Sequence, residues 1–290
     1  MGRLIQAMMD RYSMTLIGII EYCIKNMFTD VNNGMKYVVV FAGKGPGVML
    51  PEAFEIIKKL SDNVMLPIAC IIISFILTYE LISMVIDRNN MHEVDSALLA
   101  RYLFKAAASV FLLSKSYEIT MAVFDVGAYI VTEAGKLIVS DLDLSVSDAM
   151  INTYVNSLQN ASVSELYAAA GGLMLCMFSF KIITVLVVVI SYGRLVEMFL
   201  MVSVSPVAFA TFGNKEWGQI GANYLKAIVA LAFQGFLIMV LVAVYAAILE
   251  GVTHTSNLPA AVFNLVILSF LFCFGLFKTS TLSKQIFTVR

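Results

Sequence analysis

Long apolar stretches, separated by short polar ones, run through most of the chain. The first covers residues 64–86, VMLPIACIIISFILTYELISMVI. At about 1.5 Å of rise per residue, it is long enough to cross a hydrocarbon core of about 30 Å. Further apolar stretches follow at residues 166–190, 195–212, 220–249 and 260–278. This pattern predicts an all-α, polytopic transmembrane protein.

Residues 97–138 are also mostly apolar, but charged residues interrupt them: Arg101, Lys105, Lys115, Glu118 and Asp125. The stretch predicts either one long tilted helix or two short ones, and we expect one crossing with a protruding end. The chain then has about five to six spans.

An amphipathic N-terminal region precedes the spans. Residues 3–28 place apolar side chains at three- and four-residue steps, with polar ones largely opposite. Such a helix can lie in the membrane interface or pack against a neighbouring subunit. Two stretches rich in turn-forming residues, DVNNGMKY (30–37) and AGKGPGVMLP (42–51), predict loops. Pro51 suits the first position of a helix that runs into the first span.

A long hydrophilic loop at 139–164 separates the early spans from the later ones. Ser162 and Glu165 form a capping box at its end, which predicts that a helix begins there. The chain therefore divides into an N-terminal region (1–63), the first transmembrane helices (64–138), the polar loop (139–165), and the C-terminal transmembrane helices with a short basic tail (166–290).

Composition supports the membrane assignment. The 290 residues are 60% hydrophobic and only 13% charged, whereas soluble domains carry about 25% charged residues. The formal net charge is -1, so no global field attracts nucleic acid. The basic tail favours a cytoplasmic C-terminus, while the acidic loop at 139–164 and the stretch EGVTHTSNLP (250–259) favour the outside. With six full crossings, the tail and the two loops cannot all lie on the sides that their charges favour. One apolar segment must then be re-entrant, split or non-crossing.

Several polar side chains fall inside the predicted spans: Glu80, Lys181, Arg194, Glu197, Lys226 and Gln234. A charge at mid-bilayer costs about 2.5–3.5 kcal/mol on insertion scales, so such residues usually face a bundle interior or water. Arg194 and Glu197 share a helix face and can pair locally, or Arg194 can mark the edge of a span. Pro206, among small residues, predicts a kinked packing helix. We expect these residues to serve in packing or to line a path.

Signatures of catalysis are missing from the sequence. It contains no GxxxxGK[ST] loop, no HExxH and no SxxK pattern. The four cysteines, Cys23, Cys70, Cys176 and Cys273, lie apart, and both histidines lie in predicted loops. We expect no enzyme activity, no cofactor and no metal site.

The order of features resembles a known family. An arginine opens a span, SPVAFA lies near its end, and a short loop with Trp217 precedes a long span with a central Gln234, in the run SYGRLVEMFLMVSVSPVAFATFGNKEWGQIGANYLKAIVALAFQGFLIMVLVAVY. This run resembles the TrbL/VirB-six family of polytopic inner-membrane subunits of type IV secretion and conjugation machines. The resemblance is best over 166–249. The apolar stretch 260–278 departs from a simple five-span pattern.

The resemblance implies a non-enzymatic channel or scaffold subunit in the bacterial cytoplasmic membrane that helps DNA or protein cross it. It also implies partners: further copies of the chain, other subunits including separate ATPases, membrane lipid, and transiently the DNA or protein that is moved. The family's usual topology places the N-terminus and the central loop outside and the C-terminus in the cytoplasm.

Two other hypotheses remain open at this point. The chain could be a small-molecule transporter or ion channel that uses Lys181, Arg194 and Glu80, although its halves show no inverted repeat. Alternatively, it could be a scaffold for cell-envelope assembly that forms no conduit.

Overall fold

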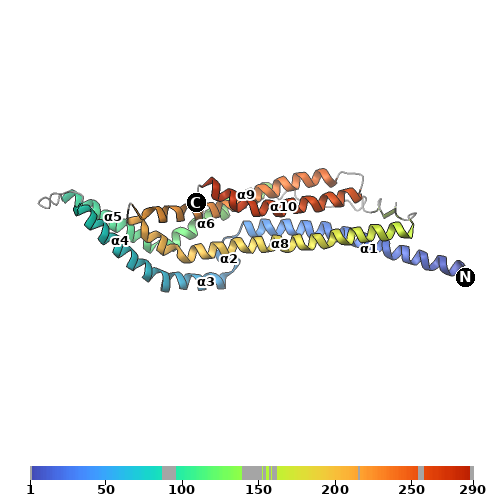
Figure 1. Ribbon diagram of the computed structural model, residues 1–290, viewed down its shortest axis with the longest axis horizontal. Coiled ribbons are helices and arrows are strands. Elements are labelled where there is room, and N and C mark those ends of the chain that lie inside the picture. Colours follow the sequence, from blue (N-terminus) through green and yellow to red (C-terminus); the bar gives the residue numbers. More distant parts are fainter. Residues whose placement is uncertain are drawn as a thin grey trace. The chain divides into compact units, whose positions relative to one another are not determined.

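The computed structural model describes residues 2–86, 96–138, 162–214, 216–253 and 258–287, together with 152, 155, 156 and 158. Throughout these residues the chain forms helices and their connections, with no strand (Figure 1). The helices are α1 (Gly2–Ala42), α2 (Pro46–Met49), α3 (Pro51–Leu60), α4 (Leu66–Ile86), α5 (Ser96–Ser114), α6 (Ser116–Ile138), α8 (Val163–Ala210), α9 (Gly218–Thr253) and α10 (Leu258–Ile286). A π-helical turn (Ser61–Met65) joins α3 to α4, and a 3-10 turn (Thr211–Gly213) follows α8.

The helices that can cross a membrane agree with the prediction of a polytopic protein. Among the residues that the structure describes, four helical stretches are long and apolar enough to cross a membrane: Pro51–Ile86, Val163–Gly213, Gly218–Leu249 and Phe263–Ile286. A fifth is added if α5 and α6, which meet at a bend of 63°, are counted as one span. The prediction of an all-α polytopic protein is confirmed, and residues 97–138 form two helices joined by a bend rather than one straight helix.

The predicted loop at 30–37 is wrong, because α1 continues through it to Ala42. Asn32, Asn33 and Gly34 are typical of turns, but the apolar positions on either side keep helical spacing. Val31, Met35 and Val38 are buried, and burial of this stripe outweighs the weak local preference for a turn. The second predicted loop is confirmed in part: a bend around 43–45 and the short α2 separate α1 from α3, and Pro51 begins α3.

The prediction of separate spans at 166–190 and 195–212 is also wrong. Both lie in α8, a single helix of 48 residues that passes through Arg194 and Pro206. Such a helix rises about 72 Å, more than twice the thickness of a hydrocarbon core. The predicted capping box at its start is confirmed: the Ser162 backbone N–H donates to Glu165 Oε2 at 2.8 Å, and the Glu165 N–H approaches Ser162 Oγ at 3.4 Å.

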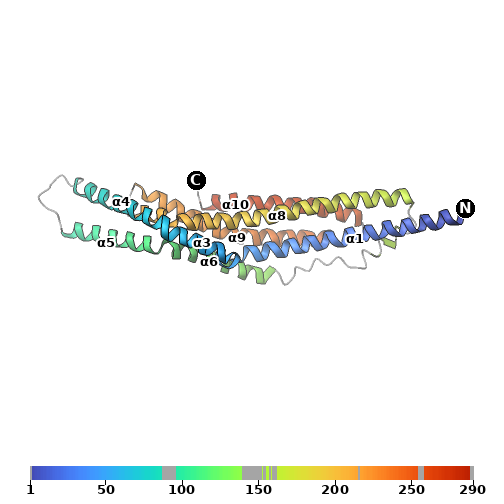
Figure 2. The ribbon, with the colours of Figure 1, turned by 90° about the horizontal axis from the view of Figure 1, so that it is seen from below.

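The chain forms two compact units, each made of segments far apart in sequence. The first unit comprises Met1–Ala42, Glu133–Ser191 and Leu237–Thr279, and the second comprises Gly43–Thr132, Tyr192–Phe236 and Ser280–Arg290. Within the first unit, α1 runs beside α8, α9 and α10 (Figures 1 and 2). Its core is apolar and includes Ile20, Ile24, Met27, Leu166, Phe180, Met239, Leu249 and Leu265. The N-terminal amphipathic helix therefore packs on its own chain, a possibility that the sequence reading did not include.

The described residues of the second unit include two apolar cores. The larger joins α6, α8 and α9 through Phe124, Met198, Val202, Ala208, Phe209, Tyr224, Ile228, Leu231 and Ala232. The smaller joins α4, α5 and the end of α8 through Ala69, Ile73, Leu113 and Ala210. The α4–α5 pair forms a helical hairpin (Figure 2).

Candidate functional site

Polar side chains of α8 and α10 meet around two adjacent carbonyl groups of α9, in a group that we name the Arg194 cluster. It consists of Arg194 and Glu197 on α8, Ser283 and Lys284 on α10, and the main-chain oxygens of Ala230 and Leu231. All of these residues belong to the second unit.

Arg194 is buried, with 8% of its surface exposed, and its Nη2 donates to the Leu231 carbonyl over 3.4 Å. Ser283 Oγ donates to the neighbouring Ala230 carbonyl. A helix carbonyl can accept a second bond because it has two lone pairs. These two contacts therefore connect α8 and α10 to the same turn of α9.

Glu197 pairs with α10. Lys284 Nζ lies 2.6 Å from Glu197 Oε1, and both side chains are a little over one-third exposed. At such exposure an ion pair adds little in water, but a membrane setting raises the cost of leaving either charge unpaired. The sequence suggested Arg194 as a partner of Glu197, whereas the structure gives Glu197 a partner on another helix.

A second group, the Glu80 cluster, lies in the same unit. Glu80 on α4 accepts bonds at both carboxylate oxygens, from Lys105 on α5 and from Asn214 Nδ2 at 3.0 Å. The Tyr102 hydroxyl also donates to the Leu77 carbonyl at 3.1 Å. The Glu80 side chain is only 14% exposed, and a buried carboxylate is tolerated when its charge and both oxygens are satisfied. The cluster ties the α4–α5 hairpin to the connection after α8.

Lys181 lies on α8 but belongs to the first unit, where its partner is on α1 rather than in either cluster. Its Nζ is 2.7 Å from Asp30 of α1, and the two side chains are 56% and 18% exposed. The pair joins α1 to α8 at the rim of a cavity of about 30 Å³, which has room for one or two waters.

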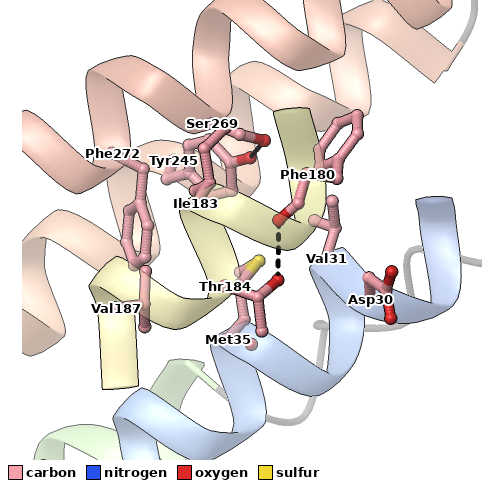
Figure 3. A pocket seen from close by; sticks show the side chains of 11 residues that line it. Asp30, Val31, Met35, Phe180, Ile183, Thr184, Val187, Tyr245, Ser269 and Phe272 are labelled. Carbon is pink, nitrogen blue, oxygen red and sulfur yellow. Dashed lines mark hydrogen bonds between the residues drawn. The ribbon is translucent and has the colours of Figure 1, made fainter. Parts of the chain in front are cut away.

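Residues from four helices line this cavity (Figure 3). Val31 and Met35 come from α1, and Thr184 from α8 turns its hydroxyl to the Phe180 carbonyl at 2.9 Å. Tyr245 and Ser269 share a hydrogen bond of 2.7 Å on the opposite side. These local bonds satisfy the hydroxyl groups, and we assign the cavity no chemistry.

The remaining predicted residues also separate by burial. Gln234 is 4% exposed and Pro206 is buried within α8, whereas Lys226 is exposed on α9. The predicted residues therefore do not form one site: Arg194 and Glu197 share a cluster, Glu80 belongs to another, and Lys181 lies in the other unit. Across the described residues, no group of three or more His, Cys, Asp or Glu could hold a metal ion.

The sequence reading missed the partners Asp30, Lys105, Asn214, Ser283 and Lys284. Lys105 offered a signal, because it interrupts an apolar stretch and therefore needs a counter-charge. Asp30 falls in a stretch of turn-forming residues and Lys284 in the basic tail, so the sequence pattern alone indicates no helix partner for either.

These helices and their internal charge pairs define a polytopic α-helical membrane protein. Residues 31–206 match the family described as TrbL/VirB6 plasmid conjugal transfer like protein. Because the match covers more than half of the 290 residues, the chain belongs to this family. The matched region overlaps the stretch that carries the resemblance, 166–249, only over 166–206. No curated protein and no solved structure matches the chain.

Family membership implies a conjugal transfer or type IV secretion subunit that works with other subunits of the same machine and has a structural role in it. The family and the apolar helices together indicate a multi-pass membrane protein.

Proposed function

We propose that the chain is a channel or scaffold subunit of a conjugative DNA-transfer machine and helps substrate cross the bacterial cytoplasmic membrane. The observation that carries this proposal is the family match over residues 31–206. The chain acts without catalysis of its own, as a homo-oligomer together with other subunits, and separate ATPases supply the energy.

Within this function, the polar residues divide into two groups by burial. Arg194, Gln234 and Pro206 are buried within the chain, which supports a role in packing the helices. Lys181 and Lys226 are exposed, and an exposed charge on an apolar helix is costly against lipid. We therefore assign each lysine to a surface of its own unit that faces a neighbouring subunit or a water-filled path.

A topology with five crossings fits the charges of the loops. Because α8 is one helix, a chain that starts outside passes inward along Pro51–Ile86, outward along α5 and α6, inward along α8, outward along α9 and inward along α10. This path puts the acidic loop at 139–164 outside and the basic tail inside, as the loop charges favour. The conflict that six crossings created disappears, and the path is also the family's usual one.

The test is genetic complementation of DNA transfer. The gene is deleted in its native host, and transfer to recipient cells is scored after complementation with wild type or with an empty vector. The proposal predicts loss of transfer on deletion and recovery with the wild-type gene, with substrate DNA and the ATPases unchanged.

Unchanged transfer after deletion, in a host shown to be transfer-competent, would overturn the proposal. A solute-flux assay on the purified protein in vesicles serves as the counter-experiment, since a small-molecule transporter would move solute without the rest of the machine.

A further inference from the structure

A second cavity, of about 190 Å³, lies in the second unit between α4 and the connection from α8 to α9. Its lining comes from Phe75, Ile76 and Tyr79 on α4 and from Asn214, Glu216 and Trp217 on the connection. We name it the aromatic cavity. Neither the family match nor the proposed function assigns it a role.

Aromatic rings make up much of its wall. The Phe75 and Trp217 rings are 6.2 Å apart between centroids and tilted by 50°. Phe75, Tyr79 and Trp217 remain 59%, 42% and 43% exposed, while Ile76 is buried beneath them. The rings therefore present accessible surface to a ligand rather than filling a closed core.

Hydrogen bonds hold the wall in place. Asn214 Oδ1 accepts the backbone N–H groups of Glu216 at 2.6 Å and Trp217 at 3.2 Å. Asn214 Nδ2 donates to Glu80 on α4 at 3.0 Å. Because one buried amide fixes both the turn and its attachment to α4, the two sides of the aromatic cavity are organised before any ligand arrives.

The chemistry of this lining suits a cation. Aromatic faces attract organic ammonium groups through their quadrupoles. Of the described residues that line the cavity, Glu216 alone carries a charge. The neighbouring Glu80 is already paired with Lys105 and bonded to Asn214. Within the described part of the chain, the Glu216 carboxylate has no ion-pair partner and can complement a positive group.

The position of the cavity points to a lipid as the source of that group. Glu216 and Trp217 are exposed in this connection, and exposed irregular backbone does not occur against the hydrocarbon core, because lipid offers its polar groups no partners. Trp and Tyr also concentrate at head-group depth. On α4, the exposed side chains Ile68, Ile71 and Phe75 follow one another at helical spacing and lead to the cavity. They form an apolar stripe along which an acyl chain can lie.

We propose that the aromatic cavity binds the ammonium head group of a zwitterionic phospholipid, with an acyl chain along the α4 stripe. This binding fixes the α4 face and the α8–α9 connection to one lipid and is separate from substrate transfer.

The chain contains a single tryptophan, Trp217, so its fluorescence reports on this cavity alone. The full-length protein is reconstituted in nanodiscs of phosphatidylglycerol, and phosphatidylethanolamine with brominated acyl chains is added in steps. The proposal predicts quenching that saturates at a low mole fraction. Brominated phosphatidylglycerol, the control, quenches in proportion to its mole fraction.

Two variants test the recognition. Glu216→Gln removes the charge but keeps the shape, and we expect it to reduce the preference for the ethanolamine lipid by about two- to fivefold, the size of one exposed cation–π or charge contact. Glu52→Gln, at an exposed glutamate of α3, is the matched control and keeps the preference. Elution of each variant as one sharp peak in gel filtration checks that it folds.

Equal, unsaturated quenching by both lipids would overturn the proposal, and so would a Glu216→Gln variant with undiminished preference. Soluble phosphoethanolamine that relieved the quenching at the same concentration as the lipid would also overturn it, because the acyl chain along α4 would then contribute nothing to binding.

Discussion

Among the described residues, the glycines that pack most tightly in the two units face different kinds of atoms. In the second unit, a Cβ added at Gly127 would lie 2.9 Å from the carbonyl oxygen of Ala232, and one at Gly221 would lie 2.9 Å from the carbonyl oxygen of Ala208. In the first unit, a Cβ at Gly275 would meet Cδ1 of Leu241 at 2.8 Å. Backbone cannot move aside without shifting a helix, whereas the end of a leucine can rotate.

Hydrogen bonds and ion pairs between helices also differ between the two units. In the second unit, side chains of α8 and α10 reach main-chain carbonyls of α9, and the Tyr224 hydroxyl joins Thr120 on α6 to the Met201 carbonyl on α8. The first unit has the partly exposed Asp30–Lys181 pair and the Tyr245–Ser269 bond. Helices in lipid associate through close packing and polar bonds. The second unit is therefore the part whose helix register the sequence fixes most tightly.

The largest predicted effect is that of Gly127→Ala. The added methyl group forces α6 and α9 apart, and overpacking of this kind costs about 1–3 kcal/mol. Gly275→Ala in the first unit should cost less than about 1 kcal/mol, because Leu241 can change rotamer. The measurement is the temperature at which the purified protein in detergent loses its gel-filtration peak.

Gly172→Ala serves as the control, because a Cβ at this position in α8 meets nothing within 4 Å. It should leave the midpoint unchanged or raise it, since alanine favours a helix over glycine by up to about 1 kcal/mol. A Gly275→Ala variant as unstable as Gly127→Ala would remove the distinction between the units.

Removing Lys181 and removing Asp30 from their ion pair should lower the stability of the protein by different amounts. Lys181→Met leaves the less exposed carboxylate of Asp30 without its cation, and we expect a loss of about 1 kcal/mol after allowing for its partial exposure. Asp30→Asn leaves a lysine that is 56% exposed, so its cost should stay within about 0.5 kcal/mol. Thermal midpoints of both variants check the order, and the reverse order would contradict the burial assigned to Asp30.

The smallest effect is expected at the start of α8. Ser162→Ala removes the cap from Glu165 N–H, and amide exchange in the first turn of α8 should accelerate about two- to fivefold, as loss of one cap predicts. Glu165→Gln should change exchange much less, because glutamine can complete a capping box. Hydrogen exchange followed by mass spectrometry resolves this segment, and equal acceleration in both variants would argue against the box.

Local patterns predicted much of the fold. The capping box located the start of α8, and Pro51 located the start of α3, because both features depend on neighbours within a few residues. The errors arose where distant contacts decide. Arg194 and Glu197 looked like the edge of a span, but Leu231 and Lys284 give them partners inside a continuous helix.

The same explanation holds for α1. Asn32, Asn33 and Gly34 have the chemistry of a turn, while the apolar spacing through Met35 and Val38 favoured a helix. Only the packing of that stripe within the first unit decides between them. The spacing was visible in the sequence and could have been weighed against the turn residues.

The central claim is that the chain serves DNA transfer and that Arg194 holds its helices rather than touching substrate. The most direct measurement is transfer frequency divided by the amount of folded protein, for Arg194→Ala and for Glu52→Ala, at an exposed position of α3, as the control. The account predicts that Arg194→Ala lowers the amount of folded protein and transfer together, so that their ratio stays near that of wild type. A normal amount of folded Arg194→Ala protein with transfer abolished would contradict it and put Arg194 in contact with substrate or a partner.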